Sequence, residues 1–237
     1  MQERRTKAST VNRVVSNLRR NGPGDTARIA CHRIHERFTD WRLGIKTRGF
    51  IDLELGEFCN EYEGTDYQLL HRAFRLLEGI GDDVVFLDYG CGKGRTVSVA
   101  ATKPFKRVIG IDLHEGMLAI ARNNVDRIQK RVKCPAIELL KIDATQFEVP
   151  NDVNAVFMFN PFGGDILQAV IAQISASLHR RPRTITIFFL YPPDTATDPF
   201  EQIDWCSLLT NIKVDRHRSL QFPVYQTCTE DADRASA

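Results

Sequence analysis

Residues 84–101 constrain the fold more than any other stretch of the chain, and they read Val-Val-Phe-Leu-Asp-Tyr-Gly-Cys-Gly-Lys-Gly-Arg-Thr-Val-Ser-Val-Ala-Ala. The apolar run at 84–87 predicts a strand buried on both faces of a parallel sheet. Gly90, Gly92 and Gly94 then allow a tight turn that brings bare backbone close to a ligand. A helix starting near residue 96 points free N–H groups into the same crevice. We therefore expect a ligand with acceptor atoms at the carboxyl end of this strand.

The turn does not match the two common phosphate-binding patterns. A dinucleotide fingerprint needs its third glycine where Arg95 stands, and a P-loop needs Ser or Thr after Lys93, which is followed by Gly94 instead. Asp88, two residues before the first glycine, would repel a pyrophosphate. The same acid suits a ligand that carries an ammonium and a sulfonium.

The pattern Asp88-Tyr-Gly-Cys-Gly-Lys-Gly94 resembles motif I of the class I S-adenosylmethionine-dependent methyltransferases, and later motifs extend the resemblance over residues 65–228. The resemblance implies an α/β fold with a doubly wound, mostly parallel seven-stranded sheet. It also implies S-adenosylmethionine as cofactor, lying across the carboxyl ends of the first strands. The residues of the turn that this implicates in cofactor binding are Asp88, Gly90, Cys91, Gly92 and Gly94.

Two further acids follow the next predicted strands. The strand at 107–111 ends at Asp112, whose carboxylate can accept hydrogen bonds from both ribose hydroxyls, and Leu113 is expected on one face of the adenine. Asp143 and Ala144 follow the strand at 136–142. The resemblance implies that this aspartate accepts from the adenine amine while the next backbone N–H donates to a ring nitrogen. An aspartate after a strand is also a common turn or helix cap.

Residues 62–67, Tyr-Glu-Gly-Thr-Asp-Tyr, are similar to the segment that many class I enzymes lay beside the methionine end of the cofactor. Thr65 and Tyr67 are therefore candidates for cofactor contact. Thr65 is also the predicted N-cap of a helix over 66–77. The alternative interpretation is a helix cap and a packing aromatic with no ligand role.

The end of the strand predicted at 153–159 carries the candidate chemistry. Its continuation, Asn160-Pro161-Phe162, resembles motif IV of amino-group methyltransferases, in which an Asp or Asn side chain and a backbone carbonyl hold the target N–H groups. In that motif the aromatic residue stacks on a planar target. The family's second proline is missing here, so the pattern does not point to a nucleobase. The alternatives are a tight turn at 160–161 and a packing role for Phe162.

The remaining sequence predicts the following elements and boundaries. Helices are expected at 9–20, 25–38, 165–179 and 200–209, with a turn at 21–24, a strand at 184–190 and a closing antiparallel pair at 212–218 and 222–228. Residues 1–60 form a basic, largely helical extension, 61–229 the cofactor-binding domain and 230–237 a mobile tail. The alternation of strand and helix favours the doubly wound sheet.

The small net charge of +2 hides an uneven distribution. Residues 1–50 contain twelve Lys or Arg and four Asp or Glu, a net +8, which leaves −6 for the rest of the chain. A basic arm of this kind can contact nucleic acid, anionic lipid or an acidic protein. A solvated helix face is the simpler interpretation.

Several classes of protein are disfavoured by composition. No apolar run approaches the ~18 residues that span a bilayer, and the N-terminus lacks the apolar core of a secretory signal, so we expect a cytoplasmic protein. The six cysteines form no Cys-x-x-Cys pair, which predicts reduced thiols. The order of His32, His35 and Glu36 matches neither zinc-protease motif, and we predict no metal site.

We therefore expect a methyltransferase acting on an amine or amide nitrogen. Its acceptor is a protein lysine or terminal amine, a small metabolite or a nucleic acid. The alternative is a non-catalytic module that binds S-adenosylmethionine or nucleic acid and regulates a partner. A nicotinamide oxidoreductase is disfavoured by Asp88 and Arg95. The sequence does not predict an oligomeric state.

Overall fold

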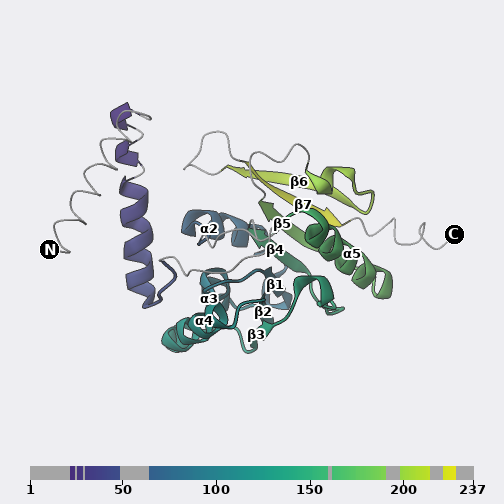
Figure 1. Ribbon diagram of the computed structural model, residues 1–237, viewed down its shortest axis with the longest axis horizontal. Coiled ribbons are helices and arrows are strands. Elements are labelled where there is room, and N and C mark those ends of the chain that lie inside the picture. Colours follow the sequence, from purple (N-terminus) through teal and green to yellow (C-terminus); the bar gives the residue numbers. More distant parts are fainter. Residues whose placement is uncertain are drawn as a thin grey trace.

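The computed structural model describes residues 22–24, 26–28, 30–48, 64–159, 162–190, 198–213 and 221–227. Seven strands form one sheet in the order β3-β2-β1-β4-β5-β7-β6 (Figure 1). The strands are β1 (Val85–Tyr89), β2 (Arg107–Asp112), β3 (Ile137–Lys141), β4 (Ala155–Phe159), β5 (Thr186–Leu190), β6 (Cys206–Lys213) and β7 (Gln221–Thr227). The first five run parallel, and β7 pairs antiparallel with both β5 and β6. The predicted fold class is confirmed.

Helices cover both faces of this sheet and bury two apolar cores. Helices α2 (Tyr67–Leu76), α3 (Arg95–Ala101) and α4 (Glu115–Arg127) contribute to one core, and α5 (Gly164–Arg180) contributes to the other. Residues of β1 alternate between the two cores, with Phe86 in the first and Leu87 in the second. The strand is fully buried because both faces are covered, as its apolar run predicts. The short 3₁₀ segments are η1 (Gly81–Asp83), η2 (Gln129–Arg131), η3 (Ala144–Gln146) and η4 (Pro199–Gln202).

The predicted helix at 200–209 is wrong. Only residues up to 202 are helical, as the 3₁₀ segment η4, and β6 begins at Cys206 instead of near residue 212. β6 pairs with β7 from Cys206–Thr227 to Lys213–Gln221, with an irregularity between Leu208 and Thr210. β6 is the edge strand, and its neighbouring residues Leu208 and Leu209 are both exposed beside this irregularity, so the apolar spacing within 200–209 lacks the alternation that predicts a strand.

The N-terminal helix is longer than predicted. Helical conformation is described for residues 22–24, 26–28 and 30–43, which covers the turn expected at 21–24 and continues past residue 38. Glu36 and Asp40, four residues apart on one face of this helix, are buried against the domain, and their contacts account for the added turns. The helix predicted at 9–20 and the tail at 230–237 lie outside the described residues. None of the described helices has the length and apolar character needed to cross a bilayer.

The packing of α3 against α4 generates the first prediction. Gly94 precedes α3 with a φ of 71°, and a Cβ added there would stand 2.7 Å from the Cβ of Ala121 in α4. Both the backbone conformation and the close contact oppose a side chain, so Gly94→Ala should lower the free energy of unfolding by about 1–3 kcal/mol. Urea denaturation followed by circular dichroism measures the change.

Gly116→Ala is the matched control. Gly116 lies within α4, no heavy atom stands within 4 Å of its added Cβ, and its φ is not positive. Alanine there should be neutral or stabilising by up to about 1 kcal/mol. Equal losses in the two variants would contradict the close approach of α3 and α4 at Gly94.

Candidate active site

The glycine turn between β1 and α3 is held against the end of β2. Gly90, Gly92 and Gly94 have φ values of 69°, 53° and 71°, a left-handed conformation that residues with a Cβ rarely adopt. The backbone N–H of Gly92 donates to Oδ2 of Asp112 at 2.8 Å, and that of Cys91 donates to the carbonyl of Ile111 at 2.9 Å. The turn therefore keeps its shape through contacts with the neighbouring strand.

Asp88 carries an unsatisfied acceptor inside the domain. Its side chain is 3% exposed, and its Oδ2 has no hydrogen-bond partner among the residues that the structure describes. Burial, and next the charge of Asp112, raise the pKa of Asp88 well above its usual value. A buried carboxylate oxygen of this kind is costly unless a donor or a cation completes it. The geometry thus marks this point as a site for a positively charged or N–H-donating group.

A cavity of about 20 Å³ lies at this carboxylate. It offers room for roughly one water-sized group. The residues around it come from the segment before α2, the glycine turn, the start of α3 and the end of β4; they are Gly64, Thr65, Asp88, Gly90, Cys91, Arg95, Thr96 and Phe159. Four predicted cofactor-binding residues, Thr65, Asp88, Gly90 and Cys91, are therefore brought together.

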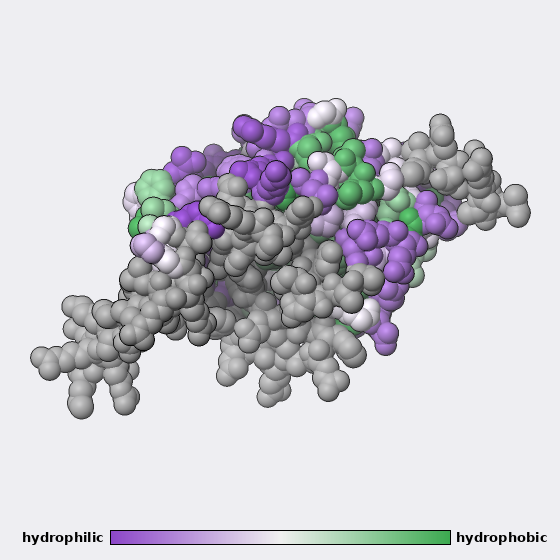
Figure 2. All heavy atoms as spheres, turned by 90° about the horizontal axis from the view of Figure 1, so that it is seen from above, coloured by the Kyte–Doolittle hydropathy of each residue, from purple (hydrophilic) through white to green (hydrophobic). Residues whose placement is uncertain are grey.

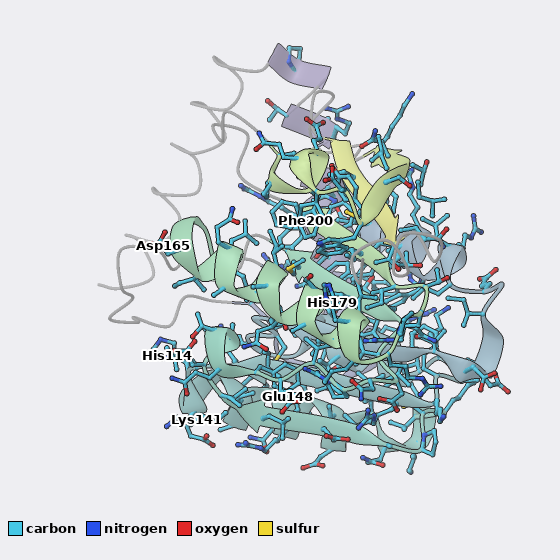
Figure 3. All side chains as sticks on the ribbon, turned by 90° about the vertical axis from the view of Figure 1, so that its right-hand side faces the viewer. His114, Lys141, Glu148, Asp165, His179 and Phe200 are labelled. Carbon is cyan, nitrogen blue, oxygen red and sulfur yellow. The ribbon has the colours of Figure 1, made fainter. Side chains whose placement is uncertain are left out.

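Leu113, Asp143 and Ala144 lie at the same edge of the sheet, beyond the ends of β2 and β3. Leu113 is 55% exposed, which leaves an apolar surface open at this edge. Oδ1 of Asp143 accepts from the backbone N–H and the hydroxyl of Thr145, so this carboxylate caps η3. Figure 3 shows Lys141 at the end of β3, His114 just after β2 and Asp165 in the first turn of α5 along one side of the molecule. The carboxyl ends of the strands thus form one continuous edge.

Arg95, the first residue of α3, is 5% exposed and joins the turn to the N-terminal segment. Its guanidinium forms ion pairs with Glu36 and, at 3.4 Å, with Asp40. It also donates to Oγ1 of Thr47 at 2.8 Å and to the carbonyl of Thr65 at 3.0 Å. These four contacts form what we call the Arg95 network. The sequence indicated only that Arg95 breaks a dinucleotide motif, and this structural role was missed.

Tyr67 belongs to this network and does not line the cavity. Its hydroxyl donates to Asp40, and the guanidinium carbon of Arg95 lies 4.6 Å from its ring centroid. Burial raises the pKa of Tyr67. Thr65 does line the cavity, with its hydroxyl 3.4 Å from that of Thr96, but it does not cap α2 as predicted. Asp66 is the N-cap, because its carboxylate accepts from two backbone N–H groups of the first turn.

His32, Glu36 and Asp66 place one candidate ligand atom each within 4.8 Å of one another. Their acceptors already have structural partners. Glu36 accepts from the backbone N–H of Tyr67 at 3.1 Å and pairs with Arg95, while Oδ1 of Asp66 caps α2 and its Oδ2 lies 3.3 Å from Nε2 of His32. A metal ion here would have to displace or face the Arg95 guanidinium, so these residues fit the network better than a metal centre.

Of the three predicted acceptor-orienting residues, only Phe162 is described. Its ring is 8% exposed and meets Tyr89 edge-on, with centroids 6.2 Å apart. Phe162 therefore packs in the second core, and its role toward an acceptor stays a prediction. Asn160 and Pro161 lie outside the described residues and remain predictions.

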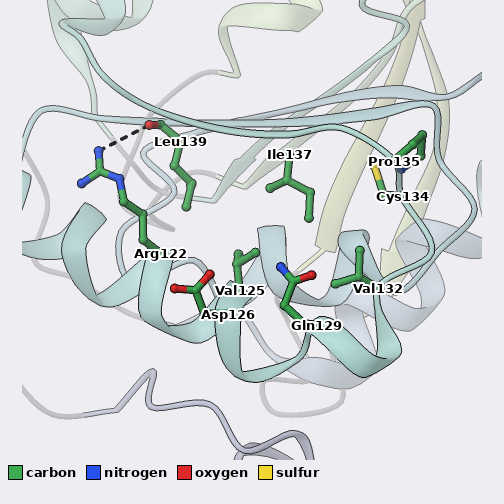
Figure 4. Close-up of a pocket in the computed structure, with 9 residues that line it drawn as sticks. All are labelled: Arg122, Val125, Asp126, Gln129, Val132, Cys134, Pro135, Ile137 and Leu139. Carbon is green, nitrogen blue, oxygen red and sulfur yellow. Dashed lines mark hydrogen bonds between the residues drawn. The ribbon is translucent and has the colours of Figure 1, made fainter.

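A larger pocket lies away from these residues, between α4 and β3 at the outer edge of the sheet (Figure 4). Its volume is about 450 Å³, and the residues around it are Arg122, Val125, Asp126, Gln129, Val132, Cys134, Pro135, Ile137 and Leu139. At the rim of this pocket, the guanidinium of Arg122 donates a hydrogen bond to the carbonyl of Leu139 at 3.5 Å. None of the predicted site residues lines it. It is therefore a separate feature of the surface.

Comparisons with known proteins agree with this geometry. Residues 86–181 match the family described as methyltransferase domain. A protein of Haemophilus influenzae assigned as a methylase, HI0767, superposes with a TM-score of 0.52 at 16% identity, over 68% of this chain and 96% of that one. Magnesium protoporphyrin IX methyltransferase from Synechocystis, solved with bound S-adenosylmethionine, gives a TM-score of 0.50 at 17% identity, over 68% of this chain and 78% of that one.

Other comparisons are more limited. The bifunctional kinase-methyltransferase WbdD gives a TM-score of 0.49 at 17% identity, and the match covers 70% of this chain but only 40% of WbdD. No curated protein matches the sequence significantly.

The strand order and the glycine turn are those of the Rossmann-like fold of class I methyltransferases, and residues 86–181 match the methyltransferase domain family.

Asp88→Asn tests the buried carboxylate in the absence of any ligand. Because the folded state raises the pKa of Asp88, its ionisation opposes folding, and this penalty appears as the pH rises through that pKa. The variant should therefore raise Tm at pH 8 by about 2–4 °C for each kcal/mol removed, and by less at acidic pH, where Asp88 is itself protonated. Thermal unfolding at several pH values measures this. A lower Tm at pH 8 would show that Asp88 is stabilising.

Arg95→Met tests the Arg95 network. It leaves Glu36 and Asp40 buried without their shared cation, so the free energy of unfolding should fall by about 3–5 kcal/mol. Arg33→Met, on the exposed side of the same helix, should change it by less than about 0.5 kcal/mol. Chemical denaturation of both variants measures the difference. Equal effects would contradict the buried ion pairs.

Proposed function

We propose that this protein transfers the methyl group of S-adenosylmethionine to an amine or amide nitrogen, with Asn160 and Pro161 orienting the acceptor. One observation carries the proposal. The cavity that holds the unpaired oxygen of Asp88 is bounded by Phe159, the residue directly before Asn160. The end of β4, after which the predicted acceptor residue follows in the sequence, thus lies at the same cavity as the Asp88 carboxylate.

The residues present fit the methyl donor along its length. The unpaired oxygen of Asp88 suits the ammonium of the methionine part, and the glycine turn leaves backbone without a Cβ around it. The Asp112 carboxylate would accept hydrogen bonds from the ribose hydroxyls, and the exposed side chain of Leu113 offers an apolar surface for the adenine. Asp143 keeps the role predicted for it through the carboxylate oxygen that does not cap η3, Oδ2.

Catalysis by the chain's own residues is mainly alignment and exclusion of water. When bound, S-adenosylmethionine supplies a methyl group already activated by its sulfonium. Asn160 would hold the N–H groups of the acceptor so that the nitrogen lone pair points at the methyl carbon. Transfer would form the C–N bond at the expense of the C–S bond of the donor, and the acceptor nitrogen would lose its proton to water. Alignment of this kind can contribute several kcal/mol, up to roughly 7–11 in the best-ordered cases.

Transfer of radiolabel from the methyl donor to fractions of a cell extract tests the proposal. Label in protein, nucleic acid or the small-molecule fraction identifies the acceptor class and supports an enzyme. Calorimetric binding of S-adenosylhomocysteine without transfer to any fraction would favour a non-catalytic module instead. Failure of both donor and product to bind the folded protein would overturn the proposal altogether.

Asn160→Ala should slow transfer by about a hundredfold, because misplacement of the acceptor alone can cost that much. The affinity for S-adenosylhomocysteine should stay within a fewfold of the parent, since the predicted role of Asn160 is toward the acceptor. Single-turnover kinetics and calorimetry measure the two quantities. Equal losses in both would move Asn160 into the cofactor site.

A further inference from the structure

The N-terminal helix turns an apolar stripe away from the domain. Ile34, Phe38 and Trp41 follow one another at spacings of four and three residues, so they share one face of the helix. They are 66%, 55% and 75% exposed, and the rings of Phe38 and Trp41 lie 5.6 Å apart. We call these three residues the outer stripe. Figure 1 shows the helix at one end of the molecule, beside α2 and α3.

The opposite face of the helix is already occupied. It carries Glu36 and Asp40, which are buried in contact with Arg95. An isolated exposed apolar residue needs no explanation, but an ordered stripe on a helix whose other face is anchored indicates a surface that something covers. Hydrophobic residues elsewhere gather in separate patches on a largely hydrophilic surface (Figure 2).

Cations border the outer stripe on both sides. From the 3.6-residue period, Arg33 and Arg37 fall along one side of it and His35 and Arg42 along the other, and all four are exposed. Within the described residues 26–48, Glu36 and Asp40 are the only acids, and both face inward. The exposed side of this part of the chain therefore combines apolar and positively charged residues without a carboxylate.

The positive region extends onto α2 and the end of α3. His71 and Arg75 are exposed on α2, and Lys103 follows α3. Burial, and then the nearby Lys103, His35, Arg42 and Arg75, lower the pKa of His71, so Arg75 and Lys103 carry the positive charge here. The groups around the outer stripe thus form one cationic area.

The apolar stripe and the basic residues beside it favour some binding partners over others. A second copy of the chain would place arginines opposite arginines, with no exposed acid in residues 26–48 to pair with them. A partner protein with a groove that encloses a helix would need more than one face of it, and the inner face of this helix is already in contact with Arg95. A nucleic acid would use the arginines and the two rings but would give Ile34 no favourable contact. A flat anionic bilayer accommodates all of these features, with apolar side chains inserted and arginines at the headgroups on either side.

We propose that the outer stripe and its bordering cations form a docking surface for an anionic membrane, on which the protein lies without crossing the bilayer. The surface does not include the cofactor site, so this inference stands apart from the methyl-transfer proposal. Docking through this helix would bring the Arg95 network, and with it the start of α3, close to the lipid surface.

Vesicle co-sedimentation of the full-length chain tests the proposal. The protein should bind vesicles of phosphatidylcholine containing about 30% phosphatidylglycerol at least tenfold more tightly than phosphatidylcholine alone, and high salt should reduce this difference. The double variant F38S/W41S should weaken binding to the anionic vesicles about tenfold, because two large side chains no longer insert. Circular dichroism checks that the variant, altered only at exposed positions, remains folded.

The matched control is L208S/L209S on β6. These leucines are 50% and 48% exposed, so the substitution removes a comparable apolar pair from another part of the surface. Binding of this control should equal that of the parent. Equal binding of F38S/W41S and the parent, or no preference for anionic vesicles, would overturn the proposal. Loss of dimers on sedimentation of F38S/W41S would overturn it in favour of a second copy.

Tryptophan fluorescence locates the contact. The chain has two tryptophans, and in the variant W205F only Trp41 reports. Its emission should shift to the blue with anionic vesicles and be quenched by brominated lipid, as insertion requires. A shift that appears with RNA but not with vesicles would assign the surface to nucleic acid and overturn the membrane proposal.

Discussion

The contacts of the Arg95 guanidinium are the interaction on which the arrangement of the site depends. They join Glu36 and Asp40 of the N-terminal helix, the irregular segment at Thr47 and the carbonyl of Thr65 to the first residue of α3. A buried arginine is tolerated only with such a set of partners, and the buried acids in turn depend on it. The helix, the segment before α2 and the glycine turn are therefore held as one unit at the carboxyl ends of β1 and β4.

The buried acids near this unit differ in their partners. Arg95 pairs with Glu36 and Asp40, whereas Oδ2 of Asp88, beside the cavity at the end of β1, is unpaired among the described residues. Glu36 and Asp40 therefore have a structural role, because Arg95 neutralises their charge, whereas no described residue pairs with Oδ2 of Asp88, as expected of a ligand-binding carboxylate. A ligand that brings its own positive charge completes the site.

The same network sets the character of the outer surface. Because both acids of the N-terminal helix turn inward to Arg95, its exposed side is left with apolar residues such as Phe38 and Trp41, and with arginines. The contact of Glu36 and Asp40 with Arg95 thus attaches one face of the helix to the domain and leaves the other face without acids. The excess of positive charge in this helix therefore lies on its exposed side, which the count of charged residues alone does not show.

Local patterns in the sequence determined the parallel sheet, the glycine turn and the order of the acids Asp88, Asp112 and Asp143, because strand runs, glycines and acids after strands are near neighbours along the chain. Contacts between distant segments were decided only by the tertiary structure. Residues 206–209 of β6 were predicted as helix because Leu208 and Leu209 are both exposed on the edge strand and break the alternation of a strand, and Phe162 packs in the second core beside Tyr89. The role of Arg95 depends on acids more than fifty residues away, and no local spacing encodes such a pairing.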